Sequence, residues 1–417
     1  MRKIVKRYMP MPLRNLLIGA RQRLAPPPID DVVLADYGFI ADPSPVPRLT
    51  LLIPNLSPAT AFGGVTTGLD IYFSLAAALR RQGRWDLRIV LTEPGRDTDA
   101  AIAAKAAGRH GFTADDITIE LVPPSAASLA LRGKDVVIAY NWWCALNARP
   151  LLEEQAQHFA QARLPLLYLI QEYEPNFYPF STAHMLAREA YDGVGPLWGV
   201  FNSSNLHRWF EAVGHRAERS FVFEPVVNDA LRPYLAAVAD HPRARRIVVY
   251  GRPNIDRNCF GALVRGLDAW IDHDPDHAGW EIVSAGTPHA PVQLAKGHTI
   301  RSLGKLTLDD YATLMLTSSV GISLMASPHP SYPPLEMAHF GLRTVTNGYF
   351  AKDLGAWHPN IVSTGAISAI PLGRAIAEAC AKAREPVVAA TNSNFVRADP
   401  YPFLPDLVAA VSALVRD

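Results

Sequence analysis

Features that mark several classes of protein are missing from this 417-residue sequence. Cysteine is scarce: the three residues Cys144, Cys259 and Cys380 are far apart, which indicates a reducing compartment and gives no spacing for a zinc site. No run of about 18 apolar residues marks a membrane-spanning helix, and the N-terminus lacks the apolar block of a secretory signal. We therefore expect a cytoplasmic protein.

An excess of one charge is absent as well. With 40 basic and 39 acidic residues, the chain gives no sign of a nucleic-acid partner. Only the segment 1–47 is biased, because its first acid, Asp30, is preceded by Arg2, Lys3, Lys6, Arg7, Arg14, Arg21 and Arg23. These basic residues fit a peripheral contact with the inner face of the plasma membrane, or a solvated or packed terminus, and the sequence leaves both open.

Short β-rich apolar runs alternate with longer helical patterns, which is typical of parallel α/β architecture. The runs expected to be strands form two series: residues 48–54, 86–94, 116–123, 135–141, 164–173, 197–204 and 220–227, then 247–251, 280–286, 298–304, 320–325, 343–347 and 360–364. Because one hydrophobic core rarely organises a chain of this length, we expect two Rossmann-like, doubly wound domains that face a central cleft.

The expected domains are residues 1–240, which begin with the basic extension 1–47, and residues 241–395. Residues 396–417 end in a helical pattern that suits packing back on the first domain. A non-catalytic two-domain binding protein of the periplasmic kind would have the same organisation, but the missing export signal counts against it.

Ligands of parallel sheets bind at the carboxyl ends of the strands, so the loops there are the candidate site. Gly63 and Gly64 follow the first strand and open a helix, where backbone amides can approach an anion, or where the fold needs only a tight turn. Arg252 and Lys305 each follow a strand of the second series, and two cations that converge on one cleft suit a diphosphate. Arg257, a few residues after Arg252, either helps to hold the phosphate or faces solvent, and taken alone it is interpreted as solvent-facing.

Glu336 lies in the stretch "PPLEMAHFG", which predicts a helix with Glu336 in its first turn. Two interpretations stay open. The carboxylate stabilises the amino end of the helix, or it accepts hydrogen bonds from a ribose diol at the cleft.

Taken together, "FGG", "YGRPN", "SLGK" and "PPLEMAHFG" resemble the GT-B glycosyltransferases of family 4. With "QEYEPNFYPF" and "FNSSNLHRWF", they resemble the rhamnosyltransferases that assemble surface-layer glycans and rhamnose-containing O-polysaccharides, from about residue 49 to about residue 365. The resemblance implies a metal-independent, retaining transfer of L-rhamnose from dTDP-L-rhamnose to a hydroxyl of a growing surface polysaccharide or lipid-linked glycan. The alternatives are a UDP- or GDP-linked donor and a non-catalytic scaffold that binds nucleotide or carbohydrate.

The resemblance also implies roles for single residues. Arg252 and Lys305 would hold the departing diphosphate, and Glu336 would bind the ribose. The other residues expected around the donor are Ser331, Tyr332, Leu335, Gly63 and Gly64, the two glycines closing the cleft from the acceptor side.

The sequence departs from the family pattern in two places. Pro328 stands where many relatives carry an acid that contacts the sugar, so Ser331 and Tyr332 are candidates to replace its contacts. No histidine follows the run 164–173, where many relatives place one. Glu172 in that loop is the candidate to position the acceptor, with a solvated loop acid as the alternative. The acceptor and the oligomeric state, including a homodimer, stay open.

Overall fold

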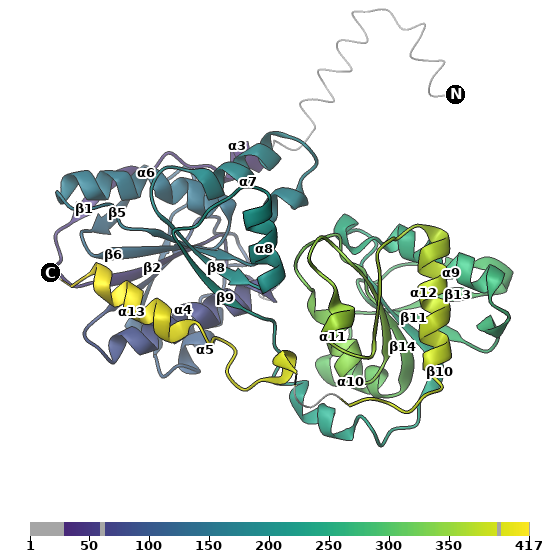
Figure 1. Cartoon of the computed structure of the whole chain (residues 1–417). Helices are drawn as coiled ribbons and strands as arrows, with labels where there is room; N and C mark the ends of the chain where they lie inside the picture. Colours follow the sequence, from purple (N-terminus) through teal and green to yellow (C-terminus); the bar gives the residue numbers. More distant parts are fainter. Residues whose placement is uncertain (1–28, 59–62, 390–392, 417) are drawn as a thin grey trace, which may run out of the picture.

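Two seven-stranded sheets, one in each half of the chain, organise the residues that the computed structural model describes, 29–58, 63–389 and 393–416. Figure 1 shows the two sheets in separate domains, each with helices on both sides. Each run expected to be a strand overlaps one, and the doubly wound α/β class is confirmed. The basic residues before Asp30, whose contact with a membrane the sequence left open, lie outside the described ranges.

The first sheet is parallel throughout, in the order β4-β3-β2-β6-β7-β8-β9. Its strands are β2 (Arg48–Ile53), β3 (Asp86–Leu91), β4 (Ile117–Leu121), β6 (Asp135–Ala139), β7 (Leu166–Ile170), β8 (Leu197–Asn202) and β9 (Arg219–Phe223). The inner strands are buried nearly along their whole length, whereas the edge strands β4 and β9 are partly exposed. This pattern explains the continuous apolar runs, because helices cover both faces of the inner strands.

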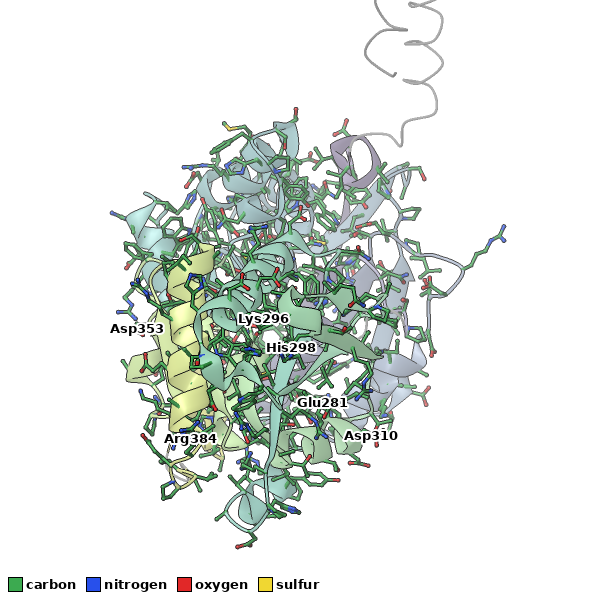
Figure 2. The ribbon with its side chains drawn as sticks, turned by 90° about the vertical axis from the view of Figure 1, so that its right-hand side faces the viewer. Glu281, Lys296, His298, Asp310, Asp353 and Arg384 are labelled. Atoms are coloured by element: carbon green, nitrogen blue, oxygen red, sulfur yellow. The ribbon has the colours of Figure 1, made fainter. Side chains whose placement is uncertain are left out.

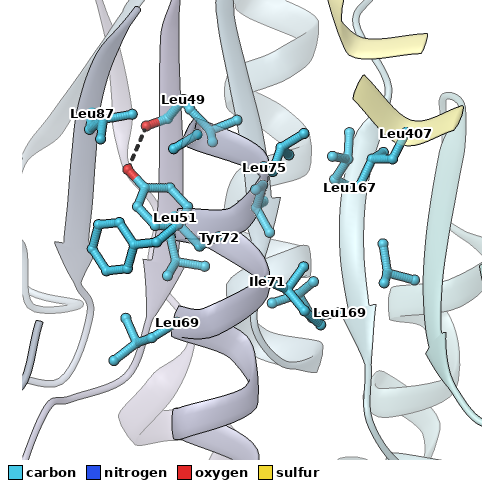
Figure 3. Close-up of a cluster of buried hydrophobic side chains, with 14 of the residues drawn as sticks. Leu49, Leu51, Leu69, Ile71, Tyr72, Leu75, Leu87, Leu167, Leu169 and Leu407 are labelled. Carbon is cyan, nitrogen blue, oxygen red and sulfur yellow. Dashed lines mark hydrogen bonds between the residues drawn. The ribbon is translucent and has the colours of Figure 1, made fainter. Parts of the chain in front are cut away.

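The helices of the first domain are α3 (Ile29–Val33), α4 (Gly64–Arg80), α5 (Ala101–Gly108), α6 (Trp142–His158), α7 (Thr182–Asp192) and α8 (Ser204–Ala212). Helix α4 packs Leu69, Tyr72 and Leu75 into the same core as the strand residues Leu49 and Leu51 (Figure 3). The hydroxyl of the buried Tyr72 donates to the Leu49 carbonyl at 3.1 Å, which satisfies its one polar group.

A separate two-stranded parallel sheet, β1 (Gly38–Asp42) with β5 (Ser128–Arg132), was not predicted from the sequence. Both strands are short and their burial is mixed, so neither carries a continuous apolar run. Arg132 Nε donates to Asp42 Oδ2 at 2.8 Å, which joins the ends of the two strands.

The second sheet has the order β12-β13-β11-β10-β14-β15-β16 and is parallel except for the short edge strand β12. Its strands are β10 (Ala244–Gly251), β11 (Glu281–Gly286), β12 (Val292–Gln293), β13 (Thr299–Gly304), β14 (Ser318–Ile322), β15 (Arg343–Asn347) and β16 (Ile361–Thr364). The helices are α9 (Phe260–His273), α10 (Leu308–Leu316), α11 (Tyr332–His339) and α12 (Ala369–Lys382).

Paired charges lie on the side of the second domain that faces the viewer in Figure 2. Glu281, the first residue of β11, pairs at 2.6 Å with Arg246 of β10 and at 2.6 Å with Arg301 of β13. Arg384, after α12, pairs with Asp276 at 2.6 Å. The Glu281 pairs join the strands near their amino ends, at the edge of the sheet opposite to the one where ligands bind.

The last helix, α13 (Leu404–Leu414), returns from the second domain and packs against α4 of the first (Figure 1). Leu407 is 1% exposed and belongs to the same hydrophobic cluster as Leu167 of β7 (Figure 3). Lys134 also donates to the carbonyl of Val415 at 2.9 Å. The end of the described chain therefore completes the core of the first domain.

Replacing Leu407 should expose how much α13 stabilises this core. We expect Leu407→Ala to cost on the order of 2 to 5 kcal/mol in the unfolding free energy of the first domain, as for other buried leucines. Scanning calorimetry would record a lower first-domain midpoint. The control is Leu308→Ala on α10, because Leu308 is 44% exposed. This variant should shift the first-domain midpoint little. An unchanged midpoint for the Leu407 variant would contradict this packing.

Candidate functional site

The two domains touch through loops that follow the carboxyl ends of their strands. Glu172, two residues after β7, accepts a hydrogen bond from the hydroxyl of Ser327 in the loop after β14. Asn176 Nδ2 donates to the Tyr349 hydroxyl at 3.1 Å, and the Tyr349 ring packs on Trp209 of α8 with centroids 5.3 Å apart. The ligand-binding edges of both sheets therefore meet here.

Gly63 and Gly64 lie at this edge of the first sheet. Gly63 has φ 45°, a left-handed conformation that favours glycine, and it caps α4, which begins at Gly64. A Cβ on Gly64 would lie 2.8 Å from the Tyr140 hydroxyl and 3.3 Å from Gln171 Oε1. The glycines thus allow α4 to approach the loop that carries Glu172, and their contact with a ligand stays a prediction.

Arg252 and Lys305 follow β10 and β13, as the sequence predicts. Arg252 is partly buried, and no hydrogen-bond or ion-pair partner of its guanidinium is found among the described residues. Lys305 is exposed. Because β11 separates β10 from β13, the two residues start roughly 10 Å apart, a gap that two long side chains can span toward one ligand.

Arg257 is partly buried at the domain contact rather than fully solvated, so the interpretation of it as a solvated side chain is wrong. Its guanidinium lies over the ring of Phe177 from the first domain, 4.7 Å from the centroid, and its Nε is buried without a hydrogen-bond partner. The turn before α9 brings it back to the domain contact, where its carbonyl accepts a hydrogen bond from Ala326 N at 2.7 Å.

Glu172 is likewise not a solvated loop acid. Burial raises the pKa of its carboxyl group, and the Ser327 hydroxyl and the charges of Arg257 and Lys352 offset part of that rise. Glu172 is the acidic side chain that faces the cations of the second domain.

Two residues that the sequence analysis missed line the same place. Lys352 is 1% exposed, and its Nζ donates to the Met325 carbonyl at 2.9 Å. Burial lowers its pKa to about 8, against the opposing charges of Glu172 and Cys259. His329 is 6% exposed, and burial together with the charges of Lys352 and Arg257 lowers its pKa to about 3. Both follow strands of the second sheet, so the strand-end rule that singled out Lys305 applies to them too.

The residues before and in α11 that were expected to bind the nucleotide sugar divide into two groups. Ser331 has φ 67° and precedes the helix, and Tyr332, its first residue, turns its hydroxyl toward Asn202 and Thr67 of the first domain. Leu335 is 1% exposed and packs in the hydrophobic core of the second domain. Its side chain therefore serves the core rather than the domain contact.

Glu336 is not in the first turn of its helix, contrary to the prediction. Helix α11 begins at Tyr332, before the two prolines, because Ser331 turns the chain there, and no acid lies in the first turn. Burial raises the pKa of Glu336 to about 7, partly offset by the hydroxyl of Tyr311 on α10. A carboxylate stabilised by the helix end would have a lowered pKa, so this position disfavours the purely helix-stabilising interpretation.

The segment Asp274-Pro275-Asp276 forms a turn, in which Asp274 Oδ1 accepts from Asp276 N at 2.9 Å. Across the described ranges, no three His, Cys, Asp or Glu side chains are grouped as metal ligands. The helices within those ranges are too short or too polar to cross a bilayer.

Comparisons with known proteins bear on the family and the fold. Residues 48–204 match the family profile described as "WsaF, N-terminal domain", and residues 245–377 match "WsaF, C-terminal domain". The O-antigen biosynthesis protein RfbC of Myxococcus xanthus is 29% identical over 297 residues, which are 69% of this chain and 21% of that protein. The chain thus spans about a fifth of the length of this relative.

Solved structures support the fold. Trehalose 6-phosphate synthase from Burkholderia multivorans superposes with a TM-score of 0.53 and 11% identity, over 88% of this chain and 97% of that one. The lipopolysaccharide outer core galactosyltransferase WaaB superposes with a TM-score of 0.50 and 11% identity, over 88% and 99%.

Two facing doubly wound domains with a helix that crosses back define the GT-B class of glycosyltransferases. Within this class the chain belongs to the WsaF family, whose two profiles together cover both domains and more than half of its length. The resemblance to GT-B glycosyltransferases is thereby confirmed.

Proposed function

We propose that this chain transfers L-rhamnose from dTDP-L-rhamnose to a hydroxyl of a growing surface polysaccharide or lipid-linked glycan. The observation that carries the proposal is the meeting of the two sheets at their ligand-binding edges, with Arg252 and Arg257 on one side and the carboxylate of Glu172 on the other. The choice of sugar is supported by the family, which is named for WsaF, an S-layer rhamnosyltransferase.

The charges suit the reaction. When the bond between the anomeric carbon and the diphosphate breaks, its electron pair stays on the phosphate oxygen, so cations at the leaving group stabilise the transition state. In the proposal Arg252 and Lys305 hold the diphosphate, Glu336 binds the ribose, and no metal is needed. The acceptor hydroxyl, positioned by Glu172, attacks on the face that the diphosphate leaves and gives its proton to the departing phosphate, which retains the anomeric configuration.

Nucleotide binding is the direct test of the donor. Titration calorimetry with the diphosphates of thymidine, uridine and guanosine should show the tightest binding for thymidine diphosphate, with the free nucleosides as controls that lack the phosphates. Tighter binding of uridine diphosphate would contradict dTDP-L-rhamnose as the donor. The chain would then be a transferase of another sugar. If no nucleotide binds, the non-catalytic carbohydrate-binding scaffold replaces the enzyme.

The two predicted diphosphate ligands should matter for turnover rather than for folding. Arg252→Ala and Lys305→Ala should each lower the release of thymidine diphosphate from dTDP-L-rhamnose by orders of magnitude, because contacts to a leaving group strengthen in the transition state. Melting temperatures should stay near that of the wild type. Arg301→Ala, which removes a surface cation at the opposite edge of the same sheet, is the matched control. Near-normal turnover in both test variants would contradict the assignment.

Glu336→Gln separates ribose binding from a structural role. A hydrogen bond to the charged carboxylate of Glu336 contributes on the order of 1.5 to 3 kcal/mol to binding. The value should lie at the lower end, because deoxyribose offers one hydroxyl in place of the diol. Affinity of the variant for thymidine diphosphate should therefore fall about tenfold.

The stability of this variant gives the second readout. The folded-state pKa of about 7 lies above the ordinary value of a glutamate, so ionisation of Glu336 destabilises the folded protein as pH rises toward and through about 7. The neutral glutamine avoids that loss, so at about pH 8 the variant should melt no earlier than the wild type. Wild-type affinity together with earlier melting would show a structural acid.

A further inference from the structure

Three buried hydrogen-bond donors of the second domain meet beside Glu172 without enough acceptors. They are Nζ of Lys352, Nε2 of His329 and Nε of Arg257. All three residues contact the loop 325–329, whose Ser327 hydroxyl donates to Glu172: His329 N donates to Ser327 Oγ at 2.9 Å, Lys352 Nζ to the Met325 carbonyl at 2.9 Å, and Ala326 N to the Arg257 carbonyl at 2.7 Å. Because buried donors are almost always paired in folded proteins, such a group indicates a missing acceptor.

Lys352 is held in place by its own turn. Its backbone N donates to the Tyr349 carbonyl at 2.9 Å, and Tyr349 N donates back to the Lys352 carbonyl at 3.1 Å. An ammonium group has three N–H donors, and within the described residues the Met325 carbonyl is the acceptor that its Nζ reaches. With 1% of the residue exposed, water satisfies little of the remainder.

His329 is a neutral donor with a fixed tautomer. The backbone N of Ser331 donates to its Nδ1 at 3.0 Å, so the ring hydrogen sits on Nε2. That nitrogen is buried and has no hydrogen-bond partner. Burial, together with the neighbouring positive charges, keeps the ring uncharged, so the ring offers one N–H donor in a set direction.

A ligand that satisfies these groups must accept three hydrogen bonds and carry negative charge. A sugar hydroxyl would add no negative charge beside two cations that face the single acid Glu172, whereas a phosphate oxyanion adds charge and fits all three donors. We propose that Lys352, His329 and Arg257 bind the distal phosphate of the donor, the one that bears the sugar. This inference rests on the proposed function and adds Lys352 and His329 as catalytic residues.

Position within the domain selects the distal phosphate. Glu336, the proposed ribose ligand, faces Tyr311 on α10, within the second domain. Lys352, His329 and Arg257 instead face Glu172 of the first domain, where sugar and acceptor would meet. Negative charge grows on this phosphate as its bond to the sugar breaks, so the three donors bind the transition state more tightly than the ground state.

Calorimetry with thymidine diphosphate and thymidine monophosphate tests the assignment, because only the first has the distal phosphate. Lys352→Met and His329→Leu should weaken diphosphate binding about tenfold or more and leave monophosphate binding within about twofold. His329→Gln, whose amide keeps a donor near the place of Nε2, should retain most of the affinity. Lys382→Met, which removes an exposed lysine of α12, is the matched control.

Two results would overturn the assignment: unchanged diphosphate affinity in Lys352→Met and His329→Leu, or an equal loss for both nucleotides. Inorganic pyrophosphate separates this inference from the proposed function. If the wild type binds pyrophosphate through Lys352 but binds no nucleotide, the oxyanion cluster stands and the nucleotide-sugar donor fails. If it binds neither, both fail.

The pH dependence of binding gives an independent signature of Lys352. Its ammonium loses its proton near the pKa of about 8, so affinity for thymidine diphosphate should fall between about pH 7 and about pH 9. Lys352→Arg keeps its charge and should remove this fall.

The other groups around Lys352 do not mimic that signature. Arginine guanidinium groups keep their proton in proteins, and His329 stays neutral over this range. Burial moves the pKa of Cys259 and of Tyr349 upward, away from it. Glu172→Gln removes the contribution of the facing acid to the pH dependence of affinity. This substitution is made both in the wild type and together with Lys352→Arg. A fall that persists with Lys352→Arg would contradict the role of Lys352.

Discussion

The hydrogen bond between Glu172 and Ser327 is the interaction on which the site depends, because it joins the ligand-binding edges of the two sheets. It also sets the balance of charge there. Glu172 is the carboxylate that faces Arg257 and Lys352, and a buried charge is tolerated only where an opposite charge or a hydrogen bond compensates it. An anion that enters the site competes with Glu172 for these cations, so ligand binding and the contact between the domains share the same charges.

The architecture could be predicted because it depends on local patterns. Apolar runs such as 48–54 and 135–141 became buried central strands, since a sheet covered on both faces needs apolar residues at successive positions. Parallel strands then send their following loops to one edge, which is why the positions of Arg252 and Gly64 could be predicted as well. The strands β1 and β5 were not predicted, because short, half-exposed strands carry no continuous apolar run.

The details of the site depend on packing between distant segments, which periodicity does not encode. Lys352 lies in a stretch that is typical of a polar turn, and its burial follows from contact with Met325 and with the first domain. Arg257 lies in a segment whose composition is typical of a solvated turn, yet Phe177 from the other domain packs against its guanidinium. The start of α11 depended on the positive φ of Ser331, a backbone conformation that serine does not signal in a sequence.

The two edges of each sheet divide stability from ligand binding. At the amino edge of the first sheet, the fully buried Asp135 accepts from Arg48 Nε at 3.0 Å and from Arg88 at 3.3 Å, and Glu281 plays a comparable part in the second sheet. These charges are paired across neighbouring strands and contribute to the order of the sheet. At the carboxyl edges, the donors of His329, Arg257 and Lys352 are left short of acceptors, which costs folding free energy. A fold can keep such a cost only if other parts offset it, and the paired amino edges and the core completed by α13 are where this chain does so.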